Sequence, residues 1–433
     1  MERKSSRLDG VYASILARRG TQGRLRRLTI PTPETVDFSS NSYLSLSRDQ
    51  DIWSAYLDRL QQSPANQGFS LGSGGSRLLD GNSAAAEALE CTAAAFHGAP
   101  AGLLFNSGFE ANTGLFGCAP QPGDVVVYDE LIHASVHDGI RLSRARGISF
   151  AHNCVRGKSR TSLDHVLSEL TQGQDGHRLR AGEINVFVAV ESVYSMDGDL
   201  APLADIVECV EERLPNGNGY IVVDEAHATG WLGERGRGLV CHLGLEDRVW
   251  ARVHTFGKAM GCAGAIVLCS PTTRQYLINY ARSFIYTTAM GYPTLAGIQT
   301  AYEYLESGRV EPRLAHLRSL IKHTHRLLTS ICTRHQPPPR DVVLYTKEGV
   351  PESPIIPLFT AHARSLAEYL QRRGFMVRPI VAPTVPAGTD RVRLCLHAGN
   401  TMEEVQGLCK AIDEWVAEKL SESGEPSEKP SKL

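Results

Sequence analysis

The stretch Tyr220-Ile221-Val222-Val223-Asp224-Glu225-Ala226-His227 decides the fold class of this chain. Its first four residues form an apolar run without polar alternation, which is typical of a strand buried on both faces of a parallel sheet. In open sheets of this kind, ligands bind beyond the carboxyl ends of the strands, and Asp224 stands at that end. The stretch therefore predicts a ligand site that contains the Asp224 carboxylate.

Similar apolar runs lie on both sides of this stretch, at Val125–Val127, Val186–Val190 and Ala265–Leu268. The segments between them have helical composition and are long enough for crossovers. This alternation predicts an α/β fold with a mostly parallel sheet between about residue 100 and residue 270. A proline-rich break, Gln336–Arg340, is followed by a different order of elements. The expected elements after it are a strand at Ile355–Phe359, a helix at Ser365–Arg373, a short extended segment at Phe375–Val377 and a strand at Arg391–Leu396. They predict a smaller α+β domain, in which Arg391 and Arg393 lie on one face of their strand.

The composition indicates a soluble globular protein. The chain has 433 residues, 42% of them hydrophobic and 21% charged, and its net charge of −2 gives no reason to expect nucleic acid or an anionic membrane as a partner. No apolar run reaches the roughly 18 residues that a membrane span needs. The ten cysteines include no Cys-x-x-Cys pair. Several, such as Cys91, Cys262, Cys269 and Cys395, lie in apolar or small-residue runs, so we expect packed, reduced thiols and neither disulfides nor a metal site.

A lysine in small and apolar surroundings follows Asp224 by 34 residues, in Thr255-Phe256-Gly257-Lys258-Ala259-Met260-Gly261. Such surroundings lower the pKa of a lysine and favour its attack on an aldehyde. An isolated lysine among glycines is more often an ordinary loop residue. The preceding Asp224 and the following strand favour a cofactor site, in which Asp224 would pair with a protonated pyridine nitrogen. The alternatives for Asp224 are a helix cap and a magnesium ligand, but no phosphate-binding Gly-x-x-x-x-Gly-Lys-Ser/Thr motif accompanies it.

Two weaker signals agree with a cofactor site. Ser107 and Gly108 follow the short strand Leu103–Phe105 and begin a helix, which forms a cup of free amide groups suited to a phosphate. His133 also follows a strand, and its flat ring could stack on an aromatic cofactor. Alone, each of these features is common in proteins without any such site.

Together these residues resemble the α-oxoamine synthases, pyridoxal-phosphate enzymes of the fold-type-I aminotransferase superfamily. The resemblance extends from Phe38-Ser39-Ser40-Asn41 to Leu396. The motifs that carry it are Gly72-Ser73-Gly74-Gly75-Ser76-Arg77, Ser107-Gly108-Phe109, His133-Ala134-Ser135, Ser195-Met196-Asp197-Gly198-Asp199, Asp224-Glu225-Ala226-His227 and Thr255-Phe256-Gly257-Lys258.

The resemblance implies a role for each site residue. Pyridoxal 5'-phosphate would be held by Lys258 as a Schiff base, with Asp224 at the pyridine nitrogen and the His133 ring stacked on the cofactor. The other implied cofactor contacts are His227 and Ser195 near the phenolic oxygen, and Gly108, Phe109 and Thr255 on the phosphate side. The implied substrate contacts are Asn41, Arg393 as a clamp for the amino-acid carboxylate, and Thr384 and Arg26 at the acyl-thioester entrance.

The resemblance also implies a reaction. Two stretches, Thr255–Ser270 and Ala382–Thr389, favour the decarboxylative condensation of L-alanine with pimeloyl-CoA to 8-amino-7-oxononanoate, CoA and CO2, a step of biotin biosynthesis. The alternatives are the same chemistry on another amino acid or acyl thioester, a simple transaminase, and a catalytically silent scaffold. Gly291-Tyr292 after Tyr286–Met290, and His397–Asn400, depart from the usual family pattern. The first departure concerns a loop that in the family reaches the partner subunit, so a homodimer is expected here.

The domain prediction is an N-terminal arm (1–45), a large cofactor-binding domain (46–290), a small C-terminal domain (291–420) and a flexible tail (421–433). The tail is Ser421-Glu422-Ser423-Gly424 followed by a polar run that cannot build a core. It ends in Ser431-Lys432-Leu433, the address read by the peroxisomal import receptor. We therefore expect a peroxisomal enzyme.

Overall fold

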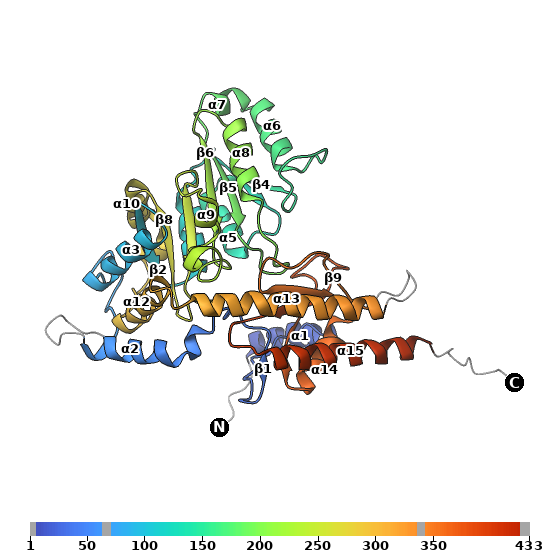
Figure 1. The fold of residues 1–433 in the computed structure, drawn as a ribbon. Helices are drawn as coiled ribbons and strands as arrows, with labels where there is room; N and C mark the ends of the chain where they lie inside the picture. The colour runs from blue at the N-terminus through green and yellow to red at the C-terminus, as the bar shows by residue number, and fades with distance from the viewer. Residues whose placement is uncertain (1–5, 63–70, 336–342, 425–433) are drawn as a thin grey trace. The chain divides into compact units, whose positions relative to one another are not determined.

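The computed structural model describes residues 6–62, 71–335 and 343–424 (Figure 1). It forms two compact units, Met1–Val36 and Asp37–Leu433. The first unit contains helix α1 (Arg7–Thr21), which begins with a capping box: Ser6 Oγ accepts a hydrogen bond from the Asp9 N–H, and the Asp9 carboxylate accepts one from the Ser6 N–H. Arg26 belongs to this unit. The predicted boundaries at residues 45, 290 and 420 remain predictions.

A seven-stranded sheet forms the centre of the second unit, with strand order β2-β8-β7-β6-β5-β3-β4 (Figure 1). Its strands are β2 (Ala101–Phe105), β3 (Val125–Asp129), β4 (Arg146–Phe150), β5 (Val186–Glu191), β6 (Gly219–Asp224), β7 (Ala251–Thr255) and β8 (Ala265–Cys269). The strands from β4 to β7 along this order are parallel. The predicted α/β class with a mostly parallel sheet is confirmed.

Strand β8 runs antiparallel to both of its neighbours, β7 and β2. The sequence predicted the strand but not its direction. Only residues 256–264 connect β7 to β8, whereas a parallel pair needs a crossover of about a dozen residues or more. The direction of β8 therefore follows from the shortness of the segment that carries Lys258.

Helices cover this sheet and the small sheet. They are α2 (Gln50–Gln62), α3 (Ala84–Phe96), α4 (Gly108–Cys118), α5 (Ala134–Ser143), α6 (Leu163–Gln172), α7 (Gly176–Arg180), α8 (Leu203–Arg213), α9 (Leu239–Leu243), α10 (Pro271–Tyr280), α11 (Arg282–Ile285), α12 (Tyr292–Glu306), α13 (Glu311–Arg334), α14 (Ala363–Arg372) and α15 (Met402–Gly424), with short 3₁₀ helices at Leu46–Arg48 and Glu234–Gly236. Helices α4 and α5 pack closely, since a Cβ on Gly139 would lie 2.6 Å from Phe116 Cβ. None of the described helices is both long and apolar enough to cross a membrane.

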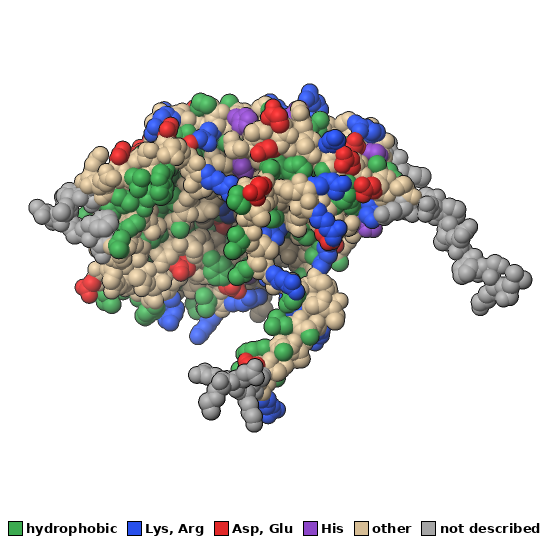
Figure 2. All heavy atoms as spheres, turned by 90° about the horizontal axis from the view of Figure 1, so that it is seen from below, with side chains coloured by type: hydrophobic (Ala, Val, Ile, Leu, Met, Phe, Trp, Pro, Cys, Tyr) green, Lys and Arg blue, Asp and Glu red, His purple; other side chains and the backbone are tan. Residues whose placement is uncertain are grey.

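A four-stranded antiparallel sheet of order β12-β13-β10-β9 lies in the C-terminal part, as the predicted α+β domain requires. Its strands are β9 (Tyr345–Thr346), β10 (Ile355–Phe359), β12 (Arg378–Ile380) and β13 (Arg391–Cys395); two further short strands are β1 (Val36–Asp37) and β11 (Phe375–Met376). Helix α14 packs on β13 and on α15. The face of the molecule in Figure 2 carries cationic and acidic side chains interspersed with one another.

Two expectations need correction, and two fall outside the described residues. Cys91 is exposed and not packed, while the ten cysteines are free thiols. Helix α15 continues to Gly424, so the first four residues of the expected tail are helical. The proline-rich break and Ser431-Lys432-Leu433 lie outside the described residues.

Candidate active site

A cavity of about 400 Å³ lies where β5, β6 and β7 end. Eight of the predicted site residues line it: Asn41, Gly108, Phe109, His133, Asp224, His227, Thr255 and Lys258. They come from segments as far apart in the chain as the residues before α2 and the β7–β8 connection. The fold therefore brings most of the predicted set together at the predicted edge of the sheet.

The Asp224 carboxylate is buried at the end of β6, with 7% of the residue exposed. Its Oδ1 accepts a hydrogen bond from the Ala226 N–H (2.9 Å), and its Oδ2 accepts one from Asn112 Nδ2 (2.7 Å). Asn112, on α4, was missed by the sequence analysis. Its Oδ1 is buried without a hydrogen-bond partner among the described residues, which fits a cavity built to receive a polar ligand.

Lys258 lies in the 256–264 segment, which is closed by hydrogen bonds from Phe256 N–H to Gly264 O (2.9 Å) and from Cys262 N–H to Phe256 O (2.8 Å). Burial lowers the pKa of Lys258, against the opposing attraction of Asp224 and Glu191. A lowered pKa favours the neutral, nucleophilic amine.

His133 precedes α5, and its Nδ1 lies 2.7 Å from Ser135 Oγ. Burial lowers the pKa of His133, so the ring is neutral near pH 7. Asn112 Nδ2 also donates to Ser135 Oγ (3.0 Å). One chain of hydrogen bonds thus connects His133, the proposed stacking ring, with Asp224, the proposed partner of the pyridine nitrogen.

A second chain connects His227 with Arg393. His227 Nδ1 lies 2.7 Å from the hydroxyl of Tyr43, which donates to Asn41 Oδ1 (3.3 Å). Arg393 donates through NH2 to the same Asn41 oxygen (2.8 Å) and through NH1 to Ser195 O (2.8 Å). Burial lowers the pKa of His227 well below its usual value. Ser195 and Arg393 are thus connected to the site although neither lines the cavity, and Tyr43 is a further residue that the sequence analysis missed.

Glu191 also lines the cavity and was not predicted. It ends β5 and pairs in register with Asp224 of β6. Burial, reinforced by the neighbouring Asp224 charge, raises the pKa of Glu191 well above its usual value. The surroundings of Glu191 therefore favour its neutral form over the carboxylate. Its place at the carboxyl end of a buried strand was a signal that could have found it.

The predicted phosphate side is the first turn of α4. Ser107 caps this helix by accepting a hydrogen bond from the Glu110 N–H (3.1 Å), and Gly108 and Phe109 follow. A Cβ on Gly108 would lie 2.4 Å from Thr255 Cγ2, so only glycine allows α4 to approach β7 this closely. A helix N-terminus offers free N–H groups and a positive dipole end to an anion, and these residues fit a phosphate ester.

Besides Arg393, two predicted substrate residues do not line the cavity. Thr384 is exposed in the connection between β12 and β13, where its N–H donates to Val381 O (3.0 Å). Arg26 belongs to the first unit. The roles of both residues remain predictions.

Of the two departures from the family pattern, the first borders the site. Ala289 donates its N–H to Gly75 O (2.9 Å), and Asn106 Nδ2 on the cavity wall donates to Thr288 O (2.7 Å), so the 286–292 segment borders the phosphate side. His397 Nδ1 lies 2.8 Å from Ser45 Oγ, and burial lowers the pKa of His397.

Comparisons with known proteins identify the family of this chain. The family model "Aminotransferase class I and II" matches residues 33–412. An 8-amino-7-oxononanoate synthase of Emericella nidulans is 54% identical over 90% of this chain and 92% of its own length. An aminoacyl transferase sphA of Aspergillus fumigatus is 38% identical over 95% of this chain and 88% of its own length.

Solved structures show the same fold. A serine palmitoyltransferase of S. paucimobilis superposes with a TM-score of 0.79 at 23% identity, covering 97% of this chain and all of its own. An 8-amino-7-oxononanoate synthase of Francisella tularensis gives a TM-score of 0.67 at 25% identity over 89% and 99% of the two chains. The predicted family, cofactor and enzyme class are confirmed: the chain belongs to the class I and II aminotransferases and, within them, to the pyridoxal-phosphate-dependent α-oxoamine synthases, which are acyltransferases.

Proposed function

We propose that this enzyme condenses L-alanine with pimeloyl-CoA, with loss of CO2 and CoA, to form 8-amino-7-oxononanoate for biotin biosynthesis. The observation that carries the proposal is the 54% identity to a synthase of this name over nearly the full length of both chains. The site supports it, because a buried lysine and a buried aspartate line the cavity, and Arg393, whose guanidinium suits a carboxylate, donates a hydrogen bond to Asn41 on the cavity wall.

The residues of the site have separate roles in the proposed reaction. When bound, pyridoxal phosphate withdraws electrons from the α-carbon of an amino acid. Asp224 would hold the proton of the pyridine nitrogen, and His133 would lie against the ring. The Lys258 amine, with its lowered pKa, would take the α-proton and return a proton to the same carbon. Arg393, held by Asn41 and Ser195, would orient the carboxylate with its planar guanidinium.

A second candidate uses another amino acid or acyl thioester in the same chemistry. The 38% identity to the aminoacyl transferase sphA over most of both chains favours it. The departure at His397–Asn400 adds support, because His397 is bonded to Ser45, close to Asn41 in the chain.

Release of CoA separates these candidates. Purified holoenzyme is assayed with L-alanine, glycine and L-serine against pimeloyl-CoA and fatty acyl-CoAs of several lengths. L-Alanine with pimeloyl-CoA should give the highest kcat/KM. A higher value for another pair would transfer the assignment to the second candidate, and turnover of keto acids without any thioester would indicate a transaminase.

The cofactor position has its own test. Reduction with borohydride followed by peptide mapping should place the label on Lys258. A label on any other lysine contradicts the role of Lys258, whichever substrates the enzyme uses.

Peroxisomal import is part of the proposal, because the chain ends in Ser431-Lys432-Leu433. Shortening of fatty acyl thioesters in that organelle could supply the pimeloyl group. A fluorescent protein fused to the N-terminus of the chain should enter peroxisomes, and removal of the last three residues should leave it in the cytosol. Equal distribution of the two fusions would contradict import through this signal.

We also propose that the enzyme is a homodimer. Large apolar side chains are exposed at Leu71, Leu79 and Tyr286, with 78%, 76% and 72% exposure, and apolar side chains gather on the left of the face in Figure 2. Exposed apolar surface of this kind marks interaction sites. Light scattering at micromolar concentration should give twice the 47.2 kDa of one chain; a mass of one chain would contradict the dimer.

A further inference from the structure

The segment Ser195–Asp199, called the 195–199 loop below, is a tight turn that the proposed mechanism uses only at Ser195. Val193 and Leu200 form a bridge at its base, and Tyr194 N–H donates to Asp199 O (3.0 Å). Gly198 has φ +71°, and a Cβ there would lie 2.2 Å from Ile355 O of β10. The loop is therefore pressed against the small sheet with no room for a side chain at its tip.

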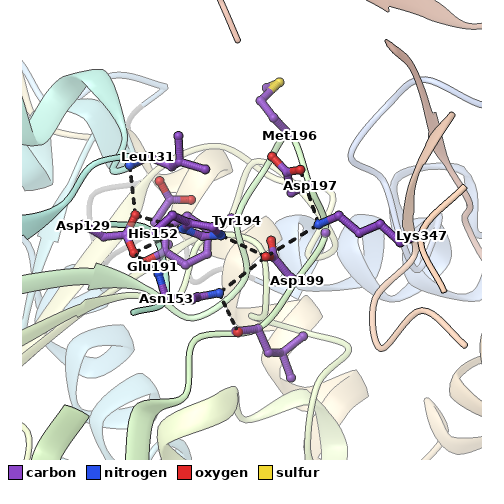
Figure 3. Close-up of polar contacts among 12 residues, drawn as sticks. Asp129, Leu131, His152, Asn153, Glu191, Tyr194, Met196, Asp197, Asp199 and Lys347 are labelled. Carbon is purple, nitrogen blue, oxygen red and sulfur yellow. Dashed lines mark hydrogen bonds and ion pairs between the residues drawn. The ribbon is translucent and has the colours of Figure 1, made fainter. Parts of the chain in front are cut away.

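On the side of the large sheet, the loop is held by a partly buried imidazole (Figure 3). His152, just after β4, places its Nε2 2.9 Å from Asp199 Oδ2 and its Nδ1 3.0 Å from Asp129 Oδ1 at the end of β3. Burial lowers the pKa of His152, but the hydrogen bonds and charges of Asp129 and Asp199 outweigh it and raise the pKa to about 10. His152 is therefore a fixed cation between two carboxylates.

On the side of the small sheet, the same loop is held by two more cations. Lys347, which follows β9, places Nζ 3.3 Å from Asp197 and 3.6 Å from Asp199 (Figure 3). Arg391 of β13 bonds Asp197 at 2.7 Å. Acidic and basic groups thus alternate without interruption from β3 to β13: Asp129, His152, Asp199, Lys347, Asp197 and Arg391.

The last group in this series of charges, Arg391, lies close in the chain to Arg393, the residue proposed to bind the substrate carboxylate. Arg393 lies two positions after Arg391, on the same face of β13, and Ser195 O of the loop accepts its hydrogen bond at 2.8 Å. The loop thus fixes one of the two acceptors that orient the guanidinium, the other being Asn41. A guanidinium must be oriented to bind both oxygens of a carboxylate.

We propose that the 195–199 loop, neutralised by His152 on one side and Lys347 on the other, is the element that positions Arg393 for the carboxylate of the amino-acid substrate. Lys347 and Asp199 are positioning residues, since neither lines the cavity. Without Lys347, the carboxylates of Asp197 and Asp199 lose a shared cation and repel each other, so the loop and its Ser195 carbonyl move. The inference rests on the proposed amino-acid substrate.

The test is direct binding to the holoenzyme, followed through the absorbance of the cofactor and without any acyl thioester. Each protein is titrated with L-alanine, glycine and L-serine, and with L-alaninol, an amine that lacks the carboxylate. In Lys347→Met, the dissociation constants of the amino acids should rise about five- to tenfold, while that of L-alaninol should stay within twofold. Lys347→Arg keeps the charge and should restore most of the affinity.

The control is Lys410→Met, because the Lys410 side chain on α15 is 80% exposed and only approaches Glu414 at 4.0 Å. It should bind all ligands as the wild type does. Equal weakening of amino acids and L-alaninol in Lys347→Met, or no weakening of either, overturns the positioning role. If the wild type binds L-alaninol but none of the amino acids, the proposed function fails as well. Because the two failures differ in the wild-type titration, they are distinguishable.

Discussion

Asn112 Nδ2 donates to Asp224 Oδ2 over 2.7 Å, and through this bond helix α4 fixes the carboxylate that faces the cofactor cavity. Hydrogen bonds to a charged group are worth about 1.5–3 kcal/mol. Asn112→Leu should therefore weaken the binding of pyridoxal phosphate about ten- to a hundredfold, measured by absorbance titration of the apoenzyme. Asn218→Leu is the matched control, because Asn218 is equally buried but donates to Leu179 O and Ile184 O. The Asn218 variant should lose thermal stability and keep its cofactor affinity.

The close approach of Gly108 to Thr255 predicts a loss of cofactor affinity that a second substitution can restore. Gly108→Ala places a methyl group 2.4 Å from Thr255 Cγ2 and should weaken cofactor binding at least about tenfold, because the phosphate site must open. Adding Thr255→Ser removes Cγ2 and should restore most of the affinity. Gly117→Ala, on the same helix with its nearest neighbour at 3.5 Å, should bind the cofactor normally. Failure of the double variant to recover would contradict a steric cause.

Arg393→Lys should raise the KM for the amino acid about tenfold or more and lower kcat much less. A lysine keeps the charge but cannot bond both carboxylate oxygens in one plane. Steady-state kinetics at varied amino-acid concentration measure the effects on KM and on kcat separately. Arg252→Lys, which replaces an equally buried arginine bonded to His97 O, should change stability and leave the KM unchanged. A fall in kcat with unchanged KM would exclude the carboxylate clamp.

The enzyme should tolerate the replacement of the buried acid Glu191 by an uncharged amide. Burial raises the pKa of Glu191 well above its usual value, which favours the neutral form of this group. Glu191→Gln should then keep kcat/KM within about threefold. In Asp224→Asn, at the neighbouring register position, kcat/KM should fall a hundredfold or more. Removal of a preorganised charged partner from an active site typically has an effect of this size. Equal losses in both variants would mean that Glu191 acts as a carboxylate.

His152 makes stability depend on pH. The pKa of its ring is raised to about 10 by Asp129 and Asp199, after the opposing effect of burial. Tyr194 also packs edge-on against the ring at 4.4 Å. A group whose folded pKa is raised contributes fully below its unfolded pKa and loses that contribution as pH rises through the folded value. The difference in free energy of unfolding between the wild type and His152→Gln should therefore be largest below about pH 6.5 and shrink toward pH 10, by at most about 1.4 kcal/mol per pH unit. For His165→Gln, which removes an exposed partner of Glu169, the difference in free energy of unfolding from the wild type should depend far less on pH.

The sequence predicted the sheet wherever a strand is uniformly apolar. Val125–Val127 and Val186–Val190 lie in β3 and β5 almost as expected. Strand β7 was missed because Arg252 and His254 interrupt it, although both are buried. Their burial depends on partners distant in the chain: Arg252 donates to His97 O, and His254 lies 2.9 Å from Thr229 Oγ1. Local pattern carries no information about such partners.

The candidate site was predicted to the extent that it follows strand ends and family motifs. Asp224, Lys258 and His133 belong to such motifs and line one cavity. Asn112 and Tyr43 were missed because an asparagine within a helix and a tyrosine in an irregular segment have no distinctive spacing. Their importance arises only when α4 and the 38–45 segment meet the end of the sheet.

The antiparallel direction of β8 determines how the reactive lysine is supported. Because the strands on both sides of the 256–264 segment are hydrogen-bonded to each other inside the large sheet, Lys258 lies in the short connection of a β-hairpin whose two ends are fixed. Its amine can change position by side-chain rotation while the hydrogen-bonded backbone of the segment stays in place. After each product leaves, the Lys258 amine therefore remains at the cavity. A new catalytic cycle can begin without a change in the backbone conformation of this segment.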